Sequence, residues 1–483
     1  MSTALVLWGL GIYIVVGTAI AWMARHRVGV GMSEYFLAGR KLGGLVAALT
    51  YSATTYSAFM LIGLAGLTYQ GGVGALGFEL IYLAGLSLVV FFGPRFWRVG
   101  HAYDYVTPAE MLGDRYESRL VAVVVAVVSC IFLIPYSAVQ LMGIGYLLEG
   151  LTEGGVSFIA GVTVAAVLAV AWAYLAGLRS VAWTDSLQSL VMIVSAVAVL
   201  VLVVRALGGP GAFAATLERD HAEWLTVPGP GYFDLPTFIG LSLPWFFFSI
   251  SNPQVSQRLF VPASLASMRV MVLGFLVFGF VYTLVSIVWG FSALVMFPGL
   301  ENPDLATPTL LSSGVVPPLL ALMVMLGITA AAISTVDSIL LTLSSMVSRD
   351  LYGNLRRDGT EQRQLLAARL VIPFIAVLAF LFARLRLDLI AVLSVASSAG
   401  LLVMVPTIIG AFYWRRGSAA GAMLSIVTGA VVVMVTQFGG WRPLGQWPGV
   451  WGLATATAVF VGVSLATRPA AEGAGKFEAV LGG

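Results

Sequence analysis

The segment 327–350, GITAAAISTVDSILLTLSSMVSRD, places hydroxyl and carboxyl groups at helical spacing inside an apolar stretch. Residues three and four positions apart share a helix face, so Ser334, Asp337 and Ser338 would lie side by side. Small residues at 330–332 would let a second helix backbone come close to that face. Hard cations prefer several oxygen ligands, so this face predicts a cation site, with sodium as the natural candidate.

A competing interpretation is that each hydroxyl bonds back to a carbonyl of the preceding turn of its own helix. That pattern is common for one or two residues in a helix. The hydroxyls of 327–350 are denser than that, because Thr342 and Ser345 continue the same stripe. We therefore favour the cation site.

Three carboxylates fall within apolar segments, namely Glu79, Asp185 and Asp337. A charged side chain is costly inside a bilayer, so it usually faces a cavity, a partner or an ion. A structural hydrogen bond between helices is the plain alternative for any single acid. Three acids beside aligned hydroxyls favour a transport pathway.

Two further apolar segments carry features that predict a broken membrane helix. The segment 49–72, LTYSATTYSAFMLIGLAGLTYQGG, is interrupted by threonines, serines and glycines. In 243–260, LPWFFFSISNPQVSQRLF, Pro253 removes a backbone hydrogen bond and disfavours helix at Asn252. An unwound stretch turns its backbone carbonyls toward a cavity, as many secondary transporters do near the middle of the bilayer.

The composition places the whole chain in a membrane. Of 483 residues, 59% are hydrophobic and 10% are charged, with a mean hydropathy of +0.98, whereas soluble domains carry about 25% charged residues. A single cysteine, Cys130, excludes a disulfide framework and argues against a thiolate metal site. The first apolar stretch lacks a cleavage pattern, so we expect a retained helix, not a removed signal peptide.

At about 20 apolar residues per crossing, the chain predicts an all-α membrane protein of about thirteen membrane-spanning helices. The expected ranges are 4–24, 42–68, 73–97, 120–148, 155–177, 183–206, 236–257, 268–297, 315–347, 364–384, 388–413, 418–438 and 447–467. The loops after odd-numbered helices, together with the tail, hold twenty of the 25 lysines and arginines, Arg258 included. Cytoplasmic loops are enriched in these residues, which predicts an outside N-terminus and a cytoplasmic C-terminus.

The two broken helices are the second and the seventh, which predicts a core of five plus five helices in inverted repeats. The first repeat would cover the second to sixth helices, about 42–206, and the second repeat the seventh to eleventh, about 236–413. The first helix and the last two would be accessory. We expect 1–483 to form a single transmembrane transporter domain.

Other classes of membrane protein fit less well. No intramembrane histidine, Cys/His cluster or phosphate-binding glycine loop supports an enzyme, and no pore repeat supports a channel. A sensor would need an appended signalling domain, and about 16 residues follow position 467. We expect a monomeric multi-pass transporter of the cell membrane that moves a small-molecule solute and binds no nucleic acid. Coupling to protons in place of sodium is the alternative within this class.

Six segments, taken in order, resemble the sodium:solute symporter family, which has the leucine-transporter-type fold. They are SEYFLAGRKLGG, SATTYSAFMLIGLAG, TPAEMLGDRYESRL, AGLRSVAWTDSLQSLVM, NPQVSQRLF and AAAISTVDSILLTLSSMVSRDLY. YFLAGR, RYESRL and STVDS look most like the pantothenate and proline branches. The resemblance implies a sodium-coupled symporter that imports its solute by alternating access.

The resemblance also implies ion sites. The family's main sodium site would here comprise the carbonyls of Ala53, Tyr56 and Ala331 with the hydroxyls of Ser334 and Thr335.

Some members bind a second sodium nearer the cytoplasm. The matching residues here are Asp185, Ser334, Asp337 and Ser338. Members with the second ion have a serine where this chain has Asp337. A second sodium, a proton, or a proton shared with Asp185 are therefore all open at this position.

The implied solute cavity contains the third intramembrane acid. Glu79 lies where the family's sugar carriers hold an acid that contacts substrate. The lining set is Thr54, Thr55, Ser57, Met60, Glu79, Gln140, Phe247, Ser249 and Asn252. The proline branch has an aspartate in place of Thr55, which argues against proline. An unpaired carboxylate argues against an organic anion such as pantothenate unless Glu79 is protonated. A vitamin, carboxylate, amino acid or sugar is left open.

Overall fold

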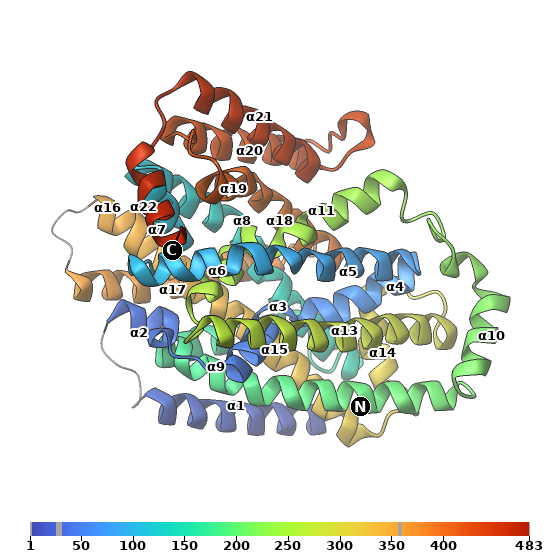
Figure 1. Cartoon of the computed structure of the whole chain (residues 1–483). Helices are drawn as coiled ribbons and strands as arrows, with labels where there is room; N and C mark the ends of the chain where they lie inside the picture. The colour runs from blue at the N-terminus through green and yellow to red at the C-terminus, as the bar shows by residue number, and fades with distance from the viewer. Residues whose placement is uncertain (1, 26–30, 356–359, 483) are drawn as a thin grey trace.

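The computed structural model describes residues 2–25, 31–355 and 360–482, and every regular element in these ranges is a helix (Figure 1). Extended pairing in the described residues is confined to one parallel bridge between Leu42 and Pro262. The long helices lie side by side, with α20 and α21 at one edge of the bundle and α1 at the opposite edge (Figure 1). The expected all-α class is confirmed.

The apolar stretches of the first half form the following elements, in which η marks short 3₁₀ or π turns. They are α1 (Thr3–Arg25), α2 (Met32–Leu37), η1 (Ala38–Arg40), α3 (Gly44–Thr55), η2 (Phe59–Leu64), α4 (Ala65–Gly71), α5 (Gly74–Gly85), α6 (Ser87–Ala102), α7 (Pro108–Arg115), α8 (Arg119–Leu151), α9 (Phe158–Ala206), α10 (Pro210–Asp220) and η3 (Ala222–Leu225).

The second half continues with the same mixture of long apolar helices and short connecting turns. Its elements are α11 (Leu235–Ser251), α12 (Pro253–Ser256), η4 (Gln257–Phe260), α13 (Leu265–Met296), η5 (Pro303–Leu305), α14 (Ala306–Ser312), α15 (Pro318–Met346), η6 (Val347–Tyr352), α16 (Gly353–Leu355), α17 (Glu361–Ala383), α18 (Ile390–Leu401), η7 (Leu402–Met404), α19 (Val405–Tyr413), α20 (Ala419–Phe438), η8 (Pro443–Gly445), α21 (Pro448–Ala466) and α22 (Ala471–Leu481).

Within the described residues, ten helices are long and apolar enough to cross a membrane, or eleven when a bent pair is counted as one crossing. The sequence predicts about thirteen, and the difference lies at the fifth and seventh positions. The expected fifth helix corresponds to a shorter apolar segment, Phe158–Tyr174. The expected seventh is α11, which has 17 residues and ends where the sequence breaks at Asn252. The polar break at Asn252 thus shortens the seventh helix, and the fifth lies inside the longer helix α9 (Phe158–Ala206).

Helix α9 joins the expected fifth and sixth helices in one continuous helical element of 49 residues. The ring of Tyr13 packs on Trp172 at 5.4 Å between centroids, and its hydroxyl lies 3.4 Å from the Gln188 amide nitrogen. Trp172 and Gln188 would be about 24 Å apart along a straight helix. One tyrosine cannot contact both across that distance, so α9 must change direction between them.

The second expected helix is broken as predicted. The segments Gly44–Thr55 and Phe59–Gly71 meet at 54°. Tyr56, at the junction, has φ −88° and ψ 81°, which lie outside the helical region. The seventh helix also breaks: Asn252 is extended and Pro253 begins a new short helix, because a residue before proline avoids helical dihedral angles.

The two ends of the bundle differ in what they carry. Helix α22 lies against α6 and α7 at the end of the bundle that also carries α16, and α10 lies at the opposite end (Figure 1). The inverted pairing of the two halves and the membrane side of each terminus stay predictions.

Candidate functional site

The end of α3 meets the middle of α15 through one threonine. The Thr335 hydroxyl lies 3.2 Å from the carbonyl oxygens of both Ala53 and Thr54, and 3.0 Å from that of Ala331. Carbonyls in the last turn of a helix have no N–H partner within that helix, so those of Ala53 and Thr54 are available to other groups. The structure therefore brings three of the five residues predicted for the main sodium site into contact.

The other two predicted ligands flank this contact. Ser334 precedes Thr335 and is 3% exposed; its hydroxyl has no partner in full hydrogen-bonding geometry among the described residues and lies near Asp185. Tyr56 caps the end of α3, and its ring stacks on Phe275 of α13 at 4.7 Å between centroids. Buried hydroxyls and free carbonyls form a set of oxygens that suits a hard monovalent cation.

A second polar cluster lies one turn further along α15. Asp185 accepts a hydrogen bond of 2.8 Å from Thr50, and the hydroxyls of Thr54 and Ser338 are 3.1 Å apart. Asp337 is 3% exposed, and one of its carboxylate oxygens has no hydrogen-bond partner in the described chain. Asp337 lies close enough to Asp185 for their charges to interact. The residues predicted for the second ion site thus gather around these two buried acids.

Arg258 belongs to this cluster, which corrects its interpretation as a loop cation. It is only 4% exposed, and its Nη2 donates to Ser338 Oγ at 2.6 Å and to Thr54 Oγ1 at 3.0 Å. Asp185 is the acid whose charge acts on it. Pro253 was the sequence feature that could have indicated this burial. A helix that breaks within the membrane leaves the following turn, η4, inside the bundle, and Arg258 belongs to that turn.

Glu79 and Gln140 are fully buried polar residues. Neither oxygen of Glu79 and neither end of the Gln140 amide has a partner in full hydrogen-bonding geometry among the described residues, although the Trp245 indole lies near the Glu79 carboxylate. Gly143, one turn beyond Gln140, packs against Ala58 at the break of the second helix. Buried polar groups are nearly always bonded, so an orphaned acid and amide need an explanation. A solute that brings its own donors and acceptors provides one.

An aromatic cluster surrounds this region. Tyr82, one turn after Glu79 on α5, packs near Trp245 at 6.2 Å and near Phe248 at 5.8 Å between ring centroids. Tyr136, one turn before Gln140, packs on Phe248 at 6.0 Å. Tyr82 and Tyr136 are not among the lining residues predicted from sequence, although their spacing of one helical turn from Glu79 and Gln140 was a usable signal.

Eight of the nine predicted lining residues are buried, and Phe247 is the one that is partly exposed. The ring of Phe247 packs on Phe246, not on the cluster of Trp245 and Phe248. Helical rotation explains this, because Trp245 and Phe248 are three residues apart and share the inner face of α11. The structure does not bring Phe247 to Glu79.

The remaining predicted lining residues are already hydrogen-bonded or apolar. Thr55 donates to Tyr51 O at 2.7 Å, and the Asn252 amide donates to Ser398 at 3.3 Å. Ser57 accepts a hydrogen bond from the backbone N–H of Phe59, and the Ser249 hydroxyl lies 3.5 Å from the Gly85 carbonyl oxygen. Thr54 contacts Ser338, as described above, and Met60 is buried in η2. These residues shape the site but leave Glu79 and Gln140 as its free polar groups.

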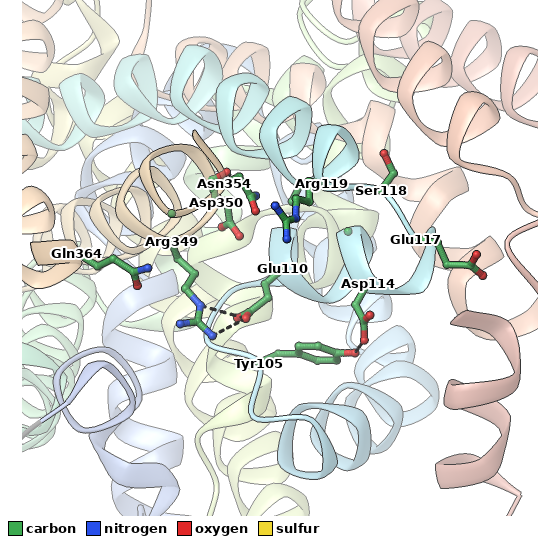
Figure 2. A pocket seen from close by; sticks show the side chains of 13 residues that line it. Tyr105, Glu110, Asp114, Glu117, Ser118, Arg119, Arg349, Asp350, Asn354 and Gln364 are labelled. Atoms are coloured by element: carbon green, nitrogen blue, oxygen red, sulfur yellow. Dashed lines mark hydrogen bonds and ion pairs between the residues drawn. The ribbon is translucent and has the colours of Figure 1, made fainter. Parts of the chain in front are cut away.

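A polar cavity of about 600 Å³ lies away from these residues, where α7 and the start of α8 meet η6, α16 and the start of α17 (Figure 2). Glu110 binds Arg349 at 2.7 Å, and Thr107 donates to Asp350 at 2.7 Å. No residue predicted for an ion or solute site lines the cavity. Its contacts attach α7 to the helix that carries Thr335.

A model of the sodium:solute symporter family matches residues 35–429. The sodium/pantothenate symporter of Escherichia coli (strain K12) is 28% identical over 449 residues, which cover 89% of this chain and 91% of that protein. The sodium/proline symporter of Staphylococcus aureus is 24% identical over 442 residues, covering 88% and 84%. The resemblance to these two branches is thereby confirmed.

Solved structures with similar folds are also transporters. The substrate-bound, outward-open structure of a Na⁺-coupled sialic acid symporter has a TM-score of 0.81 at 17% identity, covering 96% of this chain and 98% of that one. The closed structure of Mhp1, a nucleobase-cation-symport-1 family transporter, has a TM-score of 0.59 at 15% identity, covering 92% and 98%. At these identities the likeness shows a shared fold.

Proposed function

Because the chain belongs to the sodium:solute symporter family, we propose that it imports a small polar solute driven by the sodium gradient, by alternating access. The family and its relatives are transporters, not enzymes. The observation that carries the proposal is the contact of Thr335 with the carbonyls of Ala53 and Thr54. It joins a helix break to a hydroxyl-rich helix and offers oxygens from both.

Sodium coupling follows from where those oxygens lie. A ligand shifts a conformational equilibrium only when it binds one state more tightly than the other. Ligands split between α3 and α15 are in binding geometry only while the two helices keep this relative position. Sodium at the proposed site of Ala53, Tyr56, Ala331, Ser334 and Thr335 would then favour one state and raise solute affinity. By linkage, solute would raise sodium affinity by the same factor.

The solute would bind around Glu79 and Gln140, beside the broken second helix. The free carboxylate favours a solute that donates hydrogen bonds or carries positive charge, and the aromatic cluster supplies faces for an apolar or cationic part. Relatives named for pantothenate carry an organic anion. An anion would need Glu79 to be protonated, so we propose a solute with an amine or several hydroxyls.

Transport in proteoliposomes tests the proposal. Candidate solutes are first screened for raising the melting temperature of the purified protein only when sodium is present. The best solute is then offered to vesicles with an inward sodium gradient at equal pH, and to others with a proton gradient without sodium. Uptake driven by sodium supports the proposal. Uptake that follows the proton gradient alone, with solute affinity unchanged from zero to saturating sodium, rejects sodium coupling.

A further inference from the structure

Two buried acids and one buried base lie in the region where a second cation would bind. They are Asp185, Asp337 and Arg258, which are at most 4% exposed. The Arg258 guanidinium donates to Ser338 at 2.6 Å, to Thr54 at 3.0 Å, and weakly to Thr50 at 3.4 Å. Thr50 in turn donates to Asp185 at 2.8 Å. The guanidinium is thus linked to Asp185 through one hydroxyl.

We propose that Arg258 is a tethered cation that takes the place of a second sodium, so that the protein binds one sodium ion per cycle. This inference rests on the proposed sodium-coupled function. Ser338 is a predicted ligand of the second ion, and its hydroxyl already accepts a hydrogen bond from the Arg258 guanidinium. A sodium ion bound at Ser338 would lie beside a fixed positive charge, and like charges repel strongly in a low-dielectric interior.

Charge balance gives the number of ions. A buried charge without an opposite charge is strongly unfavourable, so the occluded site should be close to neutral. When both acids are ionised, Asp185 and Asp337 supply two negative charges, and Arg258 supplies one positive charge. The ligands proposed for the main site are uncharged. One sodium at that site, one turn of α15 from Asp337, makes the cluster neutral; a second sodium would leave a net positive charge.

Charge balance predicts how many sodium ions each variant binds. Replacing Arg258 with methionine keeps an unbranched, flexible side chain, removes the guanidinium and its charge, and opens the pocket to a second sodium. Arg258→Lys keeps the charge and should still bind one sodium. The pair Asp185→Asn with Arg258→Met removes one charge of each sign, so this double variant should also bind one sodium. Asp185→Asn alone leaves no net negative charge and should lose most of its sodium binding.

Equilibrium binding of ²²Na⁺ to the purified full-length protein at one fixed pH measures these numbers and needs no solute. We expect one ion per chain for the natural protein, the lysine variant and the double variant, and two for Arg258→Met. Two ions on the natural protein, or one unchanged ion on folded Arg258→Met, overturns the inference. If Arg258→Met does not fold, the double variant decides: one ion supports the inference and two overturn it. Absence of any sodium binding by the natural protein rejects the proposed function itself.

Discussion

The Arg258 guanidinium donates a hydrogen bond of 2.6 Å to the Ser338 hydroxyl, which joins the turn after the α11 break to the hydroxyl face of α15. The same nitrogen reaches Thr54, just before the break of the second helix. Both interrupted helices therefore meet α15 at one buried cation. Single substitutions can therefore test separately which residues bind sodium, which bind solute and which hold the helices together.

Thr335→Ala removes one oxygen from the proposed sodium site and leaves a small side chain. Losing a buried polar partner costs roughly 1–3 kcal/mol, which corresponds to about five- to 150-fold weaker sodium affinity. Sodium activation of transport and ²²Na⁺ binding measure this. Thr428→Ala is the control, because the Thr428 hydroxyl bonds only carbonyls of its own helix. Equal sodium affinities in the two variants would make α15 a polar packing helix and remove the sodium assignment.

Asp337→Asn tests whether this acid balances the charge of the sodium ion. We expect weaker sodium binding with a Hill coefficient for sodium that stays near one, because the ligands remain but the nearby negative charge is lost. The activation curve for uptake measures both quantities. A Hill coefficient that falls from about two toward one would instead assign Asp337 to a second sodium, and an unchanged curve would exclude both roles.

Glu79→Gln separates solute binding from stability. The Glu79 carboxylate is buried, without a partner in full hydrogen-bonding geometry among the described residues, and a neutral amide is less costly to bury than a charged group. We expect a higher melting temperature for the empty protein, weaker solute binding, and unchanged sodium binding in the absence of solute. Thermal unfolding in sodium, with and without solute, measures all three effects. A lower melting temperature together with normal solute affinity would make Glu79 a structural residue.

Phe248→Ala and Phe247→Ala form a matched pair on the same turn of α11. Phe248 packs with Trp245, Tyr82 and Tyr136 near Glu79, whereas Phe247 is partly exposed and packs on Phe246. Removing the inner ring should weaken solute binding more than removing the outer one. Solute affinity at saturating sodium decides between them. The reverse order would restore Phe247 as the solute contact that the sequence predicts.

Thr107→Val tests the attachment of α7 to the end of α15. The Thr107 hydroxyl accepts from Glu110 N at 2.9 Å and donates to Asp350 at 2.7 Å. Losing a helix cap costs about 0.5–2 kcal/mol, and an acid left unpaired adds to this loss. Ser157→Ala, which removes an exposed cap of α9, is the control. We expect a clearly larger drop in melting temperature for Thr107→Val; equal drops would show that the bond to Asp350 contributes nothing.

The sequence alone determines the features that depend on local chemistry. Apolar stretches of bilayer length predict membrane helices, Pro253 predicts the break at Asn252, and hydroxyls at helical spacing predict the face of Ser334 and Ser338. These inferences concern residues that are close in the chain, where backbone geometry fixes which side chains share a face. The family resemblance then relates that face to the second helix.

Only the tertiary structure decides which groups meet across helices. The sequence predicts that Arg258 lies in a loop, whereas helix packing places its guanidinium on Ser338, 80 positions away. Phe247 and Phe248 are adjacent phenylalanines that the sequence pattern does not distinguish. The rotation of α11 buries Phe248 in the aromatic cluster and leaves Phe247 partly exposed. Both the sequence and the structure place Glu79 in an apolar helix. Whether it has a hydrogen-bond partner depends on the helices that pack around it. Side-chain partners are set by how helices rotate and cross, and the pattern of a single helix does not contain that information.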